Sequence, residues 1–290
     1  MKTYIEIEPI YRKKYINSFV EKFPDLSTAE FILTEKIDGT NVRLYFKIDG
    51  TLVLGSRNQV LEEGKDHFWL REVIKEPKYQ AFIQYVKGKV AEKGKEIMMV
   101  GELFGEGINN RIIYGKRQIR FFDLYIEDQI RPQKEFFEFM GDFSALCVPV
   151  VGKVQGLENA LKFPEVFQSK ISSGLAEGLV IKPYLKIFRQ GGSIFYLKHK
   201  NPEFEERPTR KPHKKTRPNP LLEYISKNRV IDMFSKVGKI TSKDQLGKYV
   251  SLIREDALAD FQKDNPAVEI DKKQLKAVNG KISQVLLEFI

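Results

Sequence analysis

The sequence has little of what marks secreted, membrane or metal-binding proteins. It has one cysteine, Cys147, in 290 residues, so no disulfide can form within the chain, and we expect a reducing, cytoplasmic compartment. Its first ten residues, MKTYIEIEPI, include two glutamates and no apolar segment, unlike a secretory signal peptide. No apolar run approaches the roughly 20 residues that span a bilayer. The three histidines, His67, His199 and His213, lack the spacing of a metal site.

Positive charge is what the chain has in excess. Its 49 lysines and arginines outnumber 39 acidic residues, for a formal charge of +10 and a pI near 9.3. This balance favours a polyanionic partner, most often nucleic acid or nucleotide, although a basic protein without such a partner is the alternative. The length allows one catalytic core with a small appended domain.

The first two-thirds of the chain alternate short strand-like segments with occasional helices. Runs rich in β-branched and aromatic residues predict strands at 31–36, 42–48, 51–56, 96–103, 118–126, 147–152, 178–184 and 194–200. Asp49-Gly50 predicts a hairpin turn between the second and third of these runs. Apolar residues at helical spacing predict a helix over 77–93. The mixture predicts an α+β fold whose sheets are largely antiparallel and flanked by helices.

Composition changes at residue 207. Residues 207–220, RPTRKPHKKTRPNP, are basic and rich in proline, which predicts an extended linker. The linker could follow a phosphate backbone or serve only as a tether. From 221 onward the pattern becomes helical, with apolar residues on one face at Leu246, Tyr249, Ile253 and Leu258. The sequence thus predicts a catalytic domain at 1–206, a linker at 207–220 and a small all-α domain at 221–290.

The tetrapeptide Lys-Ile-Asp-Gly occurs twice, at 36–39 and at 47–50. The second copy lies between two strand-like runs, where a hairpin turn explains Asp49-Gly50. The first copy follows an apolar strand and is embedded in the longer segment TEKIDGTNVR at 34–43. The two copies are therefore distinguished by their context.

With its context, the first copy resembles the nucleophile motif of the covalent nucleotidyltransferases, which are DNA ligases, RNA ligases and mRNA capping guanylyltransferases. Further segments resemble this superfamily's other motifs in the same order: SRN at 56–58, GELFG at 101–105, FFDL at 121–124, EGLVIKP at 177–183 and LKHKN at 197–201. Their spacing, and the run KHKNPEF at 198–204, are most similar to the RNA ligase 2 group. The resemblance covers roughly residues 30–206. Phage-type members often carry a different residue at the position of Asp38, which leaves the subfamily open.

The resemblance implies an ATP-dependent RNA ligase that joins RNA 3′-hydroxyl and 5′-phosphate ends through a lysyl-AMP and an AMP-capped RNA end. It implies Mg²⁺ as the metal, with Mn²⁺ as a substitute, nicked duplex RNA or RNA-containing hybrids as substrates, a monomer, and compatibility with a phage or viral origin. The implied roles are Lys36 as nucleophile, Glu35, Glu102, Phe122, Lys198 and Lys200 as ATP contacts, Glu177 as metal ligand, and Asn41 and Arg57 as RNA contacts.

The chemistry of these residues suits the implied reaction. A lysine amine is nucleophilic only when neutral, and with an ordinary pKa of about 10.4 well under 0.1% is neutral at pH 7. We expect the cations Lys198 and Lys200 to disfavour the charged form of the nucleophile. Phe121 and Phe122 must face opposite sides of their strand, so at most one of them packs on adenine. Asp123 and Lys182 lie inside motifs but could instead form a structural charge pair.

Three other functions compete with this prediction. A DNA ligase or a GTP-dependent capping guanylyltransferase would append an OB-fold of short strands, whereas the C-terminal sequence is helical. A non-catalytic, ligase-like RNA-binding module would be expected to have lost the nucleophile or the metal carboxylate. This chain keeps Lys36, Glu177, Lys198 and Lys200.

Overall fold

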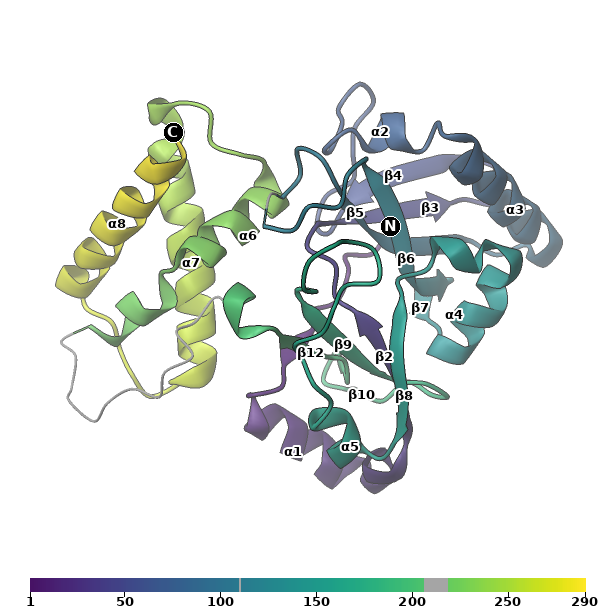
Figure 1. Cartoon of the computed structure of the whole chain (residues 1–290), viewed down its shortest axis with the longest axis horizontal. Helices are drawn as coiled ribbons and strands as arrows, with labels where there is room; N and C mark the ends of the chain where they lie inside the picture. The colour runs from purple at the N-terminus through teal and green to yellow at the C-terminus, as the bar shows by residue number, and fades with distance from the viewer. Residues whose placement is uncertain (110, 206–218) are drawn as a thin grey trace. The chain divides into compact units, whose positions relative to one another are not determined.

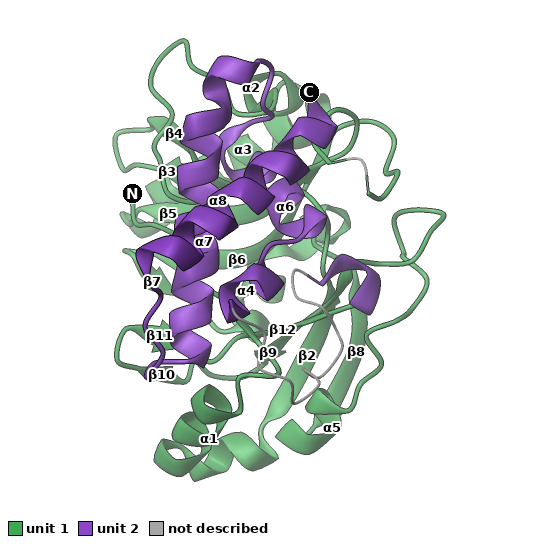
Figure 2. Ribbon diagram, turned by 90° about the vertical axis from the view of Figure 1, so that its left-hand side faces the viewer, with its two compact units in different colours: residues 1–201 green, residues 202–290 purple. Residues whose placement is uncertain are grey.

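The computed structural model describes residues 1–109, 111–205 and 219–290. These residues form two compact units, Met1–Asn201 and Pro202–Ile290, shown in different colours in Figure 2. Almost all of the predicted linker at 207–220 lies outside the described residues. No helix in the described part of the chain is long and apolar enough to cross a membrane.

Two five-stranded sheets form the framework of the first unit (Figure 1). One has the strand order β1-β12-β9-β2-β8, and its strands are β1 (Glu8–Pro9), β2 (Glu30–Glu35), β8 (Val150–Gln155), β9 (Gly178–Pro183) and β12 (Leu197–Lys200). The other has the order β4-β3-β5-β6-β7, with β3 (Thr40–Phe46), β4 (Leu52–Ser56), β5 (Ile97–Phe104), β6 (Gln118–Ile126) and β7 (Gln129–Ile130). A hairpin of β10 (Arg189–Gln190) and β11 (Ser193–Ile194) stands apart. Only β1 and β12 pair in parallel among the described strands, which confirms the predicted α+β fold with largely antiparallel sheets.

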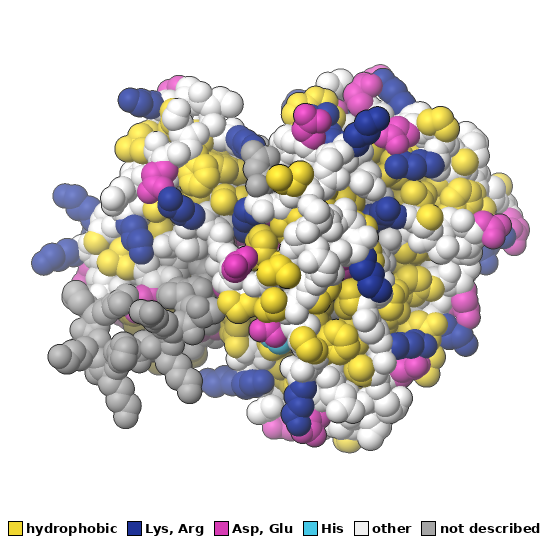
Figure 3. Space-filling model, viewed as in Figure 1, with side chains coloured by type: hydrophobic (Ala, Val, Ile, Leu, Met, Phe, Trp, Pro, Cys, Tyr) yellow, Lys and Arg dark blue, Asp and Glu magenta, His cyan; other side chains and the backbone are white. Residues whose placement is uncertain are grey.

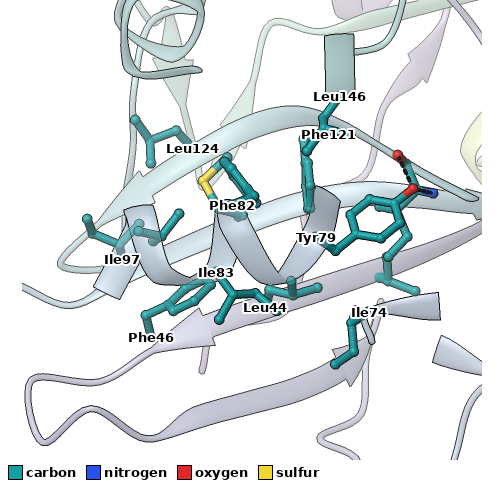
Figure 4. Packing of buried hydrophobic residues seen from close by; sticks show 14 of the residues in the cluster. Leu44, Phe46, Ile74, Tyr79, Phe82, Ile83, Ile97, Phe121, Leu124 and Leu146 are labelled. Atoms are coloured by element: carbon teal, nitrogen blue, oxygen red, sulfur yellow. Dashed lines mark hydrogen bonds between the residues drawn. The ribbon is translucent and has the colours of Figure 1, made fainter. Parts of the chain in front are cut away.

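Helices cover one face of each sheet. α1 (Lys13–Lys22) and α5 (Leu157–Leu161) share an apolar core with the first sheet. α2 (Leu70–Val73), α3 (Pro77–Lys93) and α4 (Gln133–Met140) do so with the second. In Figure 4, Phe82 and Ile83 of α3 pack among side chains of the second sheet. The Tyr79 hydroxyl donates to the Ile119 carbonyl at 3.1 Å and accepts from the Ile119 amide at 2.6 Å, which satisfies its polar end inside this core.

The opposite faces of the two sheets are joined through the N-terminal segment. Tyr4 packs with residues of the second sheet, such as Met98 and Tyr125, and with Tyr196, which leads into β12. At the same place the Lys182 ammonium on β9 lies 2.9 Å from the Asp123 carboxylate on β6, with both side chains buried. Asp123 and Lys182 therefore form the structural charge pair that the sequence left as a possibility.

The second unit is a small helical bundle. After a 3₁₀ turn at Pro220–Tyr224 come α6 (Lys227–Val237), α7 (Leu246–Asp264) and α8 (Lys272–Leu286), which enclose a separate apolar core. On α7 the buried residues Tyr249, Ile253, Ala257 and Phe261 recur every four positions. The Asn228 amide donates to the carbonyls of Glu203 and Glu205, so these residues belong to this unit. The predicted all-α C-terminal region is confirmed.

Candidate active site

The site forms where the end of β2 meets the start of β9. The two strands are antiparallel and pair Glu35 with Leu179, which brings Lys36 beside Glu177. The Lys36 amide donates to the Gly178 carbonyl at 2.8 Å. The Lys36 ammonium then reaches the Glu177 carboxylate, with 2.6 Å between Nζ and Oε2. Sheet pairing therefore joins the predicted nucleophile to the predicted metal ligand across 141 residues of sequence.

Glu177 is the centre of a cluster of cations. Its carboxylate is 1% exposed, and its second oxygen lies 3.2 Å from Lys200 Nζ and 4.0 Å from Arg111 Nη2. Burial alone would raise the pKa of Glu177, but Lys36, Lys200 and Arg111 outweigh burial and lower it to about 2. Glu177 is therefore ionised at neutral pH.

A glycine makes this arrangement possible. Gly178 has a φ of +142°, and a Cβ atom there would lie 2.2 Å from the His199 carbonyl. A side chain at this position would push β12 away from β9. Since β12 carries Lys200, the glycine keeps that lysine within reach of Glu177.

Asp38 forms a second centre beside the first. Its carboxylate is 2% exposed and accepts from Arg111 Nε at 2.9 Å and from the Asn109 amide at 2.9 Å. The Asp38 backbone amide donates to the Tyr114 hydroxyl at 3.0 Å. Arg111, Asn109 and Tyr114 all belong to the connection between β5 and β6, which is thereby fixed to the residues after Lys36.

Glu102 lies on β5 next to both centres. Burial raises the pKa of its carboxyl to about 8; Glu177 and Asp38 add to the shift, whereas the cations Lys36 and Arg57 oppose it. These mutual effects show that four separate parts of the sequence lie close together. A carboxyl with so perturbed a pKa is typical of functional sites.

Residue pairing adds Asn41 to the same face. Asn41 on β3 lies directly opposite Glu102 on β5, so their side chains share one face of the sheet. The side-chain oxygen of Asn41 is buried and accepts no hydrogen bond within the described residues. Arg57 comes just after β4, and its guanidinium donates to the Ile5 carbonyl at 3.0 Å, so the N-terminal segment orients it.

Residues 29–199 match the family model described as RNA ligase, and residues 215–286 match the one described as T4 RNA ligase 2 C-terminal. The first match alone covers more than half of the chain. The chain belongs to the RNA ligase family.

Solved structures of Naegleria gruberi RNA ligase share the fold. A lysine-to-alanine variant with ATP and Mn is 18% identical, with a TM-score of 0.52, 70% of this chain covered and 58% of that chain. An arginine-to-alanine variant with ATP and Mn is 19% identical, with a TM-score of 0.53 and coverages of 70% and 57%. The enzyme with pyrophosphate is 19% identical, with a TM-score of 0.51 and the same coverages. The chain thus spans less than two-thirds of the length of these relatives.

In this RNA ligase family fold, Phe122 lies at a β-bulge on β6. Val100 pairs with Asp123, but the next residue, Gly101, pairs with Phe121, so Phe122 has no partner on β5. Phe121 lies in the core under α3, whereas the Phe122 ring packs edge-on against Tyr4 at 5.6 Å. The expectation that the two rings face opposite sides is confirmed. A contact between Phe122 and adenine stays a prediction.

The carboxylate of Glu35 has partners within the protein. It is 1% exposed and accepts from the Ser169 hydroxyl at 2.5 Å and from the Lys170 amide at 2.8 Å. Burial raises its pKa, and these hydrogen bonds oppose the shift. If Glu35 contacts ATP as predicted, its backbone atoms would make the contact.

The remaining predicted cation, Lys198, is half-buried on β12. Alternation places it on the same face as Lys200. His199, between them, lies 3.5 Å from Glu165 instead, which confirms that it points away from the two lysines.

Sequence reasoning missed Arg111, Asn109 and Tyr114. They occupy an irregular connection whose only visible signal is a cation between glycines, after the GELFG segment. That signal is too general to assign a contact with Asp38.

Proposed function

We propose that the protein is an ATP-dependent RNA ligase that works through a lysyl-AMP at Lys36. The observation that carries the proposal is the direct contact of Lys36 with Glu177, which also binds Lys200. A nucleophilic amine, a buried carboxylate and a second cation meet in one place. This is the set of groups that phosphoryl transfer requires for positioning and for charge neutralisation.

The proposed reaction has three displacements at phosphorus. First, the neutral Lys36 amine attacks the α-phosphate of ATP; an N–P bond forms, the bond to the bridging oxygen breaks, and pyrophosphate leaves. Second, an oxygen of the RNA 5′-phosphate attacks the same phosphorus, which frees Lys36 and caps the RNA end with AMP. Third, the RNA 3′-hydroxyl loses its proton and attacks the capped 5′-phosphate, forming the phosphodiester bond and releasing AMP.

Lys36 must exchange its partner before it can attack. In the structure its nitrogen donates to Glu177, and an ammonium ion bound to a carboxylate has no lone pair to offer. The triphosphate of ATP brings anionic oxygens that can take over the surrounding cations. Lys200 is 5% exposed on its side chain and is held where it can bind an α-phosphate oxygen.

The Glu177 carboxylate fits a divalent metal. No three His, Cys, Asp or Glu side chains among residues 1–109, 111–205 and 219–290 form a ready-made metal centre. Mg²⁺ keeps several waters and needs only one or two carboxylates, and the buried carboxylate of Glu177 would supply one. When bound, the ion would neutralise charge on phosphate oxygens. Mn²⁺ would serve in the same place.

RNA ends are the proposed partner, with nicked duplex RNA as the preferred form, and the protein is proposed to act as a monomer inside the cell. Asn41 and Arg57 share the side of the sheet that carries Glu102, where they would contact the RNA strand to be joined. Lys and Arg side chains are scattered among acidic ones on the face of the first unit seen in Figure 3. Individually positioned side chains such as Asn41 and Arg57, rather than one large basic patch on that face, would then select the RNA.

The test is incubation with Mg²⁺ and ATP or GTP labelled at the α-phosphate, followed by denaturing electrophoresis and peptide mapping. We expect label from ATP on Lys36 and none on a Lys36→Ala variant. The matched control is Lys47→Ala, which changes the same residue in the second Lys-Ile-Asp-Gly copy and should label normally. Label from GTP would indicate a capping-type enzyme. No label in folded, unmodified protein would indicate a non-catalytic RNA-binding module.

A further inference from the structure

We propose that Arg111 binds the β- and γ-phosphates of ATP, the part that leaves as pyrophosphate. This inference rests on the proposed function, because it assigns a substrate contact within the same site. Arg111 lies outside the segments whose motifs indicated the function, in the connection between β5 and β6.

Arg111 and the nucleophile Lys36 approach different oxygens of the same carboxylate, that of Glu177. Arg111 Nη2 is 4.0 Å from Glu177 Oε1, and the other oxygen of that carboxylate is 2.6 Å from Lys36 Nζ. The α-phosphate must lie against Lys36 during attack, and the β- and γ-phosphates follow within a few ångströms. A cation at this distance can reach them.

The orientation of Arg111 is fixed in advance. Nε and Nη2 both face the carboxylate of Asp38, at 2.9 and 2.5 Å, and the Asn109 amide holds the same carboxylate. The Arg111 side chain is 11% exposed and that of Asp38 is 2% exposed. A buried, doubly bonded anchor reduces the entropy lost when the guanidinium binds a ligand.

The triphosphate of ATP calls for a further cation beside the predicted lysines. Lys36 and Lys200 both lie on Glu177, and Lys198 is the other lysine predicted to contact ATP. A planar guanidinium fork binds phosphate oxygens in pairs. Arg111 is already held by the two carboxylates Asp38 and Glu177, whose geometry resembles that of phosphate oxygens.

A purely structural role for Arg111 makes a different prediction. If the ion pair with Asp38 only fixed the connection between β5 and β6, then replacing Arg111 would affect ATP and AMP equally. A contact with the leaving phosphates affects ATP alone, because AMP lacks them. The difference in affinity between ATP and AMP therefore separates the two roles.

The experiment measures ATP and AMP binding by calorimetry, with Mg²⁺, in a Lys36→Ala background that cannot be adenylylated. Adding Arg111→Gln should weaken ATP binding by about 10- to 100-fold, the range expected for lost hydrogen bonds to a charged group. AMP binding should change by less than about twofold, because AMP lacks the phosphates assigned to Arg111. Arg131→Gln, which removes an arginine paired with Glu135 elsewhere in the unit, is the matched control and should change neither affinity.

A second variant addresses folding. Arg111→Gln leaves the buried carboxylate of Asp38 without its cation, so Arg111→Gln/Asp38→Asn removes both charges and should show the same selective loss of ATP. Equal losses for ATP and AMP in the double variant, or no loss of ATP, would overturn the assignment of Arg111 alone. Failure of the Lys36→Ala parent to bind either nucleotide would overturn the proposed function together with it.

Discussion

The ion pair between Lys182 and Asp123 should contribute strongly to the stability of the first unit. The two side chains are 1% and 0% exposed, and they connect β9 of one sheet to β6 of the other. The Asp123 carboxylate also accepts from the Gln133 amide at 2.7 Å and from the Tyr4 hydroxyl at 2.5 Å. Burial lowers the pKa of Lys182, although Asp123 opposes the shift. Each charge therefore depends on the other inside the protein.

Removing one partner leaves the other charge buried and uncompensated. We expect Lys182→Met and Asp123→Leu each to lower the free energy of unfolding by about 3–5 kcal/mol. The double variant removes both charges, so it should cost about as much as one single variant. The corresponding coupling energy equals the cost of one single variant, about 3–5 kcal/mol.

Denaturant unfolding followed by fluorescence measures these differences. The chain has one tryptophan, Trp69, which lies in the first unit and reports on it. Lys162→Met is the control, since the Lys162–Glu158 pair is 72% and 79% exposed, and it should change stability by less than about 0.5 kcal/mol. Additive costs in the double variant, or a single-variant cost as small as that of the control, would refute the reasoning.

Two further predictions concern a partly buried histidine and a buried arginine. Burial lowers the pKa of His67 to about 4 from its ordinary 6.5. Between pH 6.5 and pH 4 the unfolded chain therefore binds more protons than the folded protein does. Acidification through this window should lower the free energy of unfolding by up to about 3 kcal/mol. Unfolding midpoints at pH 4.5 and 7.5 should differ less in His67→Gln; an unchanged difference would contradict the assignment. In the second unit, the buried guanidinium of Arg229 donates to Asp260 at 2.9 Å and also to Asp256. Arg229→Met should therefore lower the free energy of unfolding by about 2–4 kcal/mol, measured by thermal unfolding followed by circular dichroism. A melting temperature no lower than that of the control Lys236→Met, which removes a more exposed partner of Asp256, would refute this.

Local sequence patterns were sufficient for most of the first unit. The predicted helix at 77–93 and the strand at 118–126 match α3 and β6 residue for residue. The buried residues of α3 recur at helical spacing, and β6 is rich in aromatic and β-branched residues that are buried on both faces of its sheet. The predicted turn at Asp49-Gly50 is also present: Gly50 has a φ of +84° and its amide donates to the Lys47 carbonyl at 3.0 Å. These features depend on neighbouring residues alone.

The predicted strand boundaries are wrong where pairing with another strand divides an apolar segment. The predicted strand at 147–152 begins instead at Val150, because Val148 donates to the Phe121 carbonyl of the other sheet and Pro149 has no amide to offer. The predicted strand at 194–200 is reduced to β12 because Ile194 pairs with Arg189 in a separate hairpin. α1, α2, α4 and α5 were missed, since short helices give few periods to detect.

The motifs located Glu177 and the cations around it but not the groups that orient them. Lys36, Glu177 and Lys200 were found by resemblance and do meet. The partners of Asp38 and Glu35 come from irregular connections, where no periodic pattern specifies a contact. Arg111 could be recognised only after folding had placed it beside Asp38.

The two copies of Lys-Ile-Asp-Gly show why the motif alone could not define the site. In the second copy, the Asp49 carboxylate accepts from the Thr51 amide, and a Cβ atom at Gly50 would meet nothing within 4 Å. In the first copy, a Cβ atom at Gly39 would lie 2.5 Å from the Leu103 carbonyl, so the glycine is needed for β5 to approach. The close approach of β5 places Glu102 beside the first copy, together with Arg111 from the connection after β5, which binds Asp38. The same four residues thus form an exposed turn in one place and a buried centre in the other, because only the first copy lies between strands of two sheets.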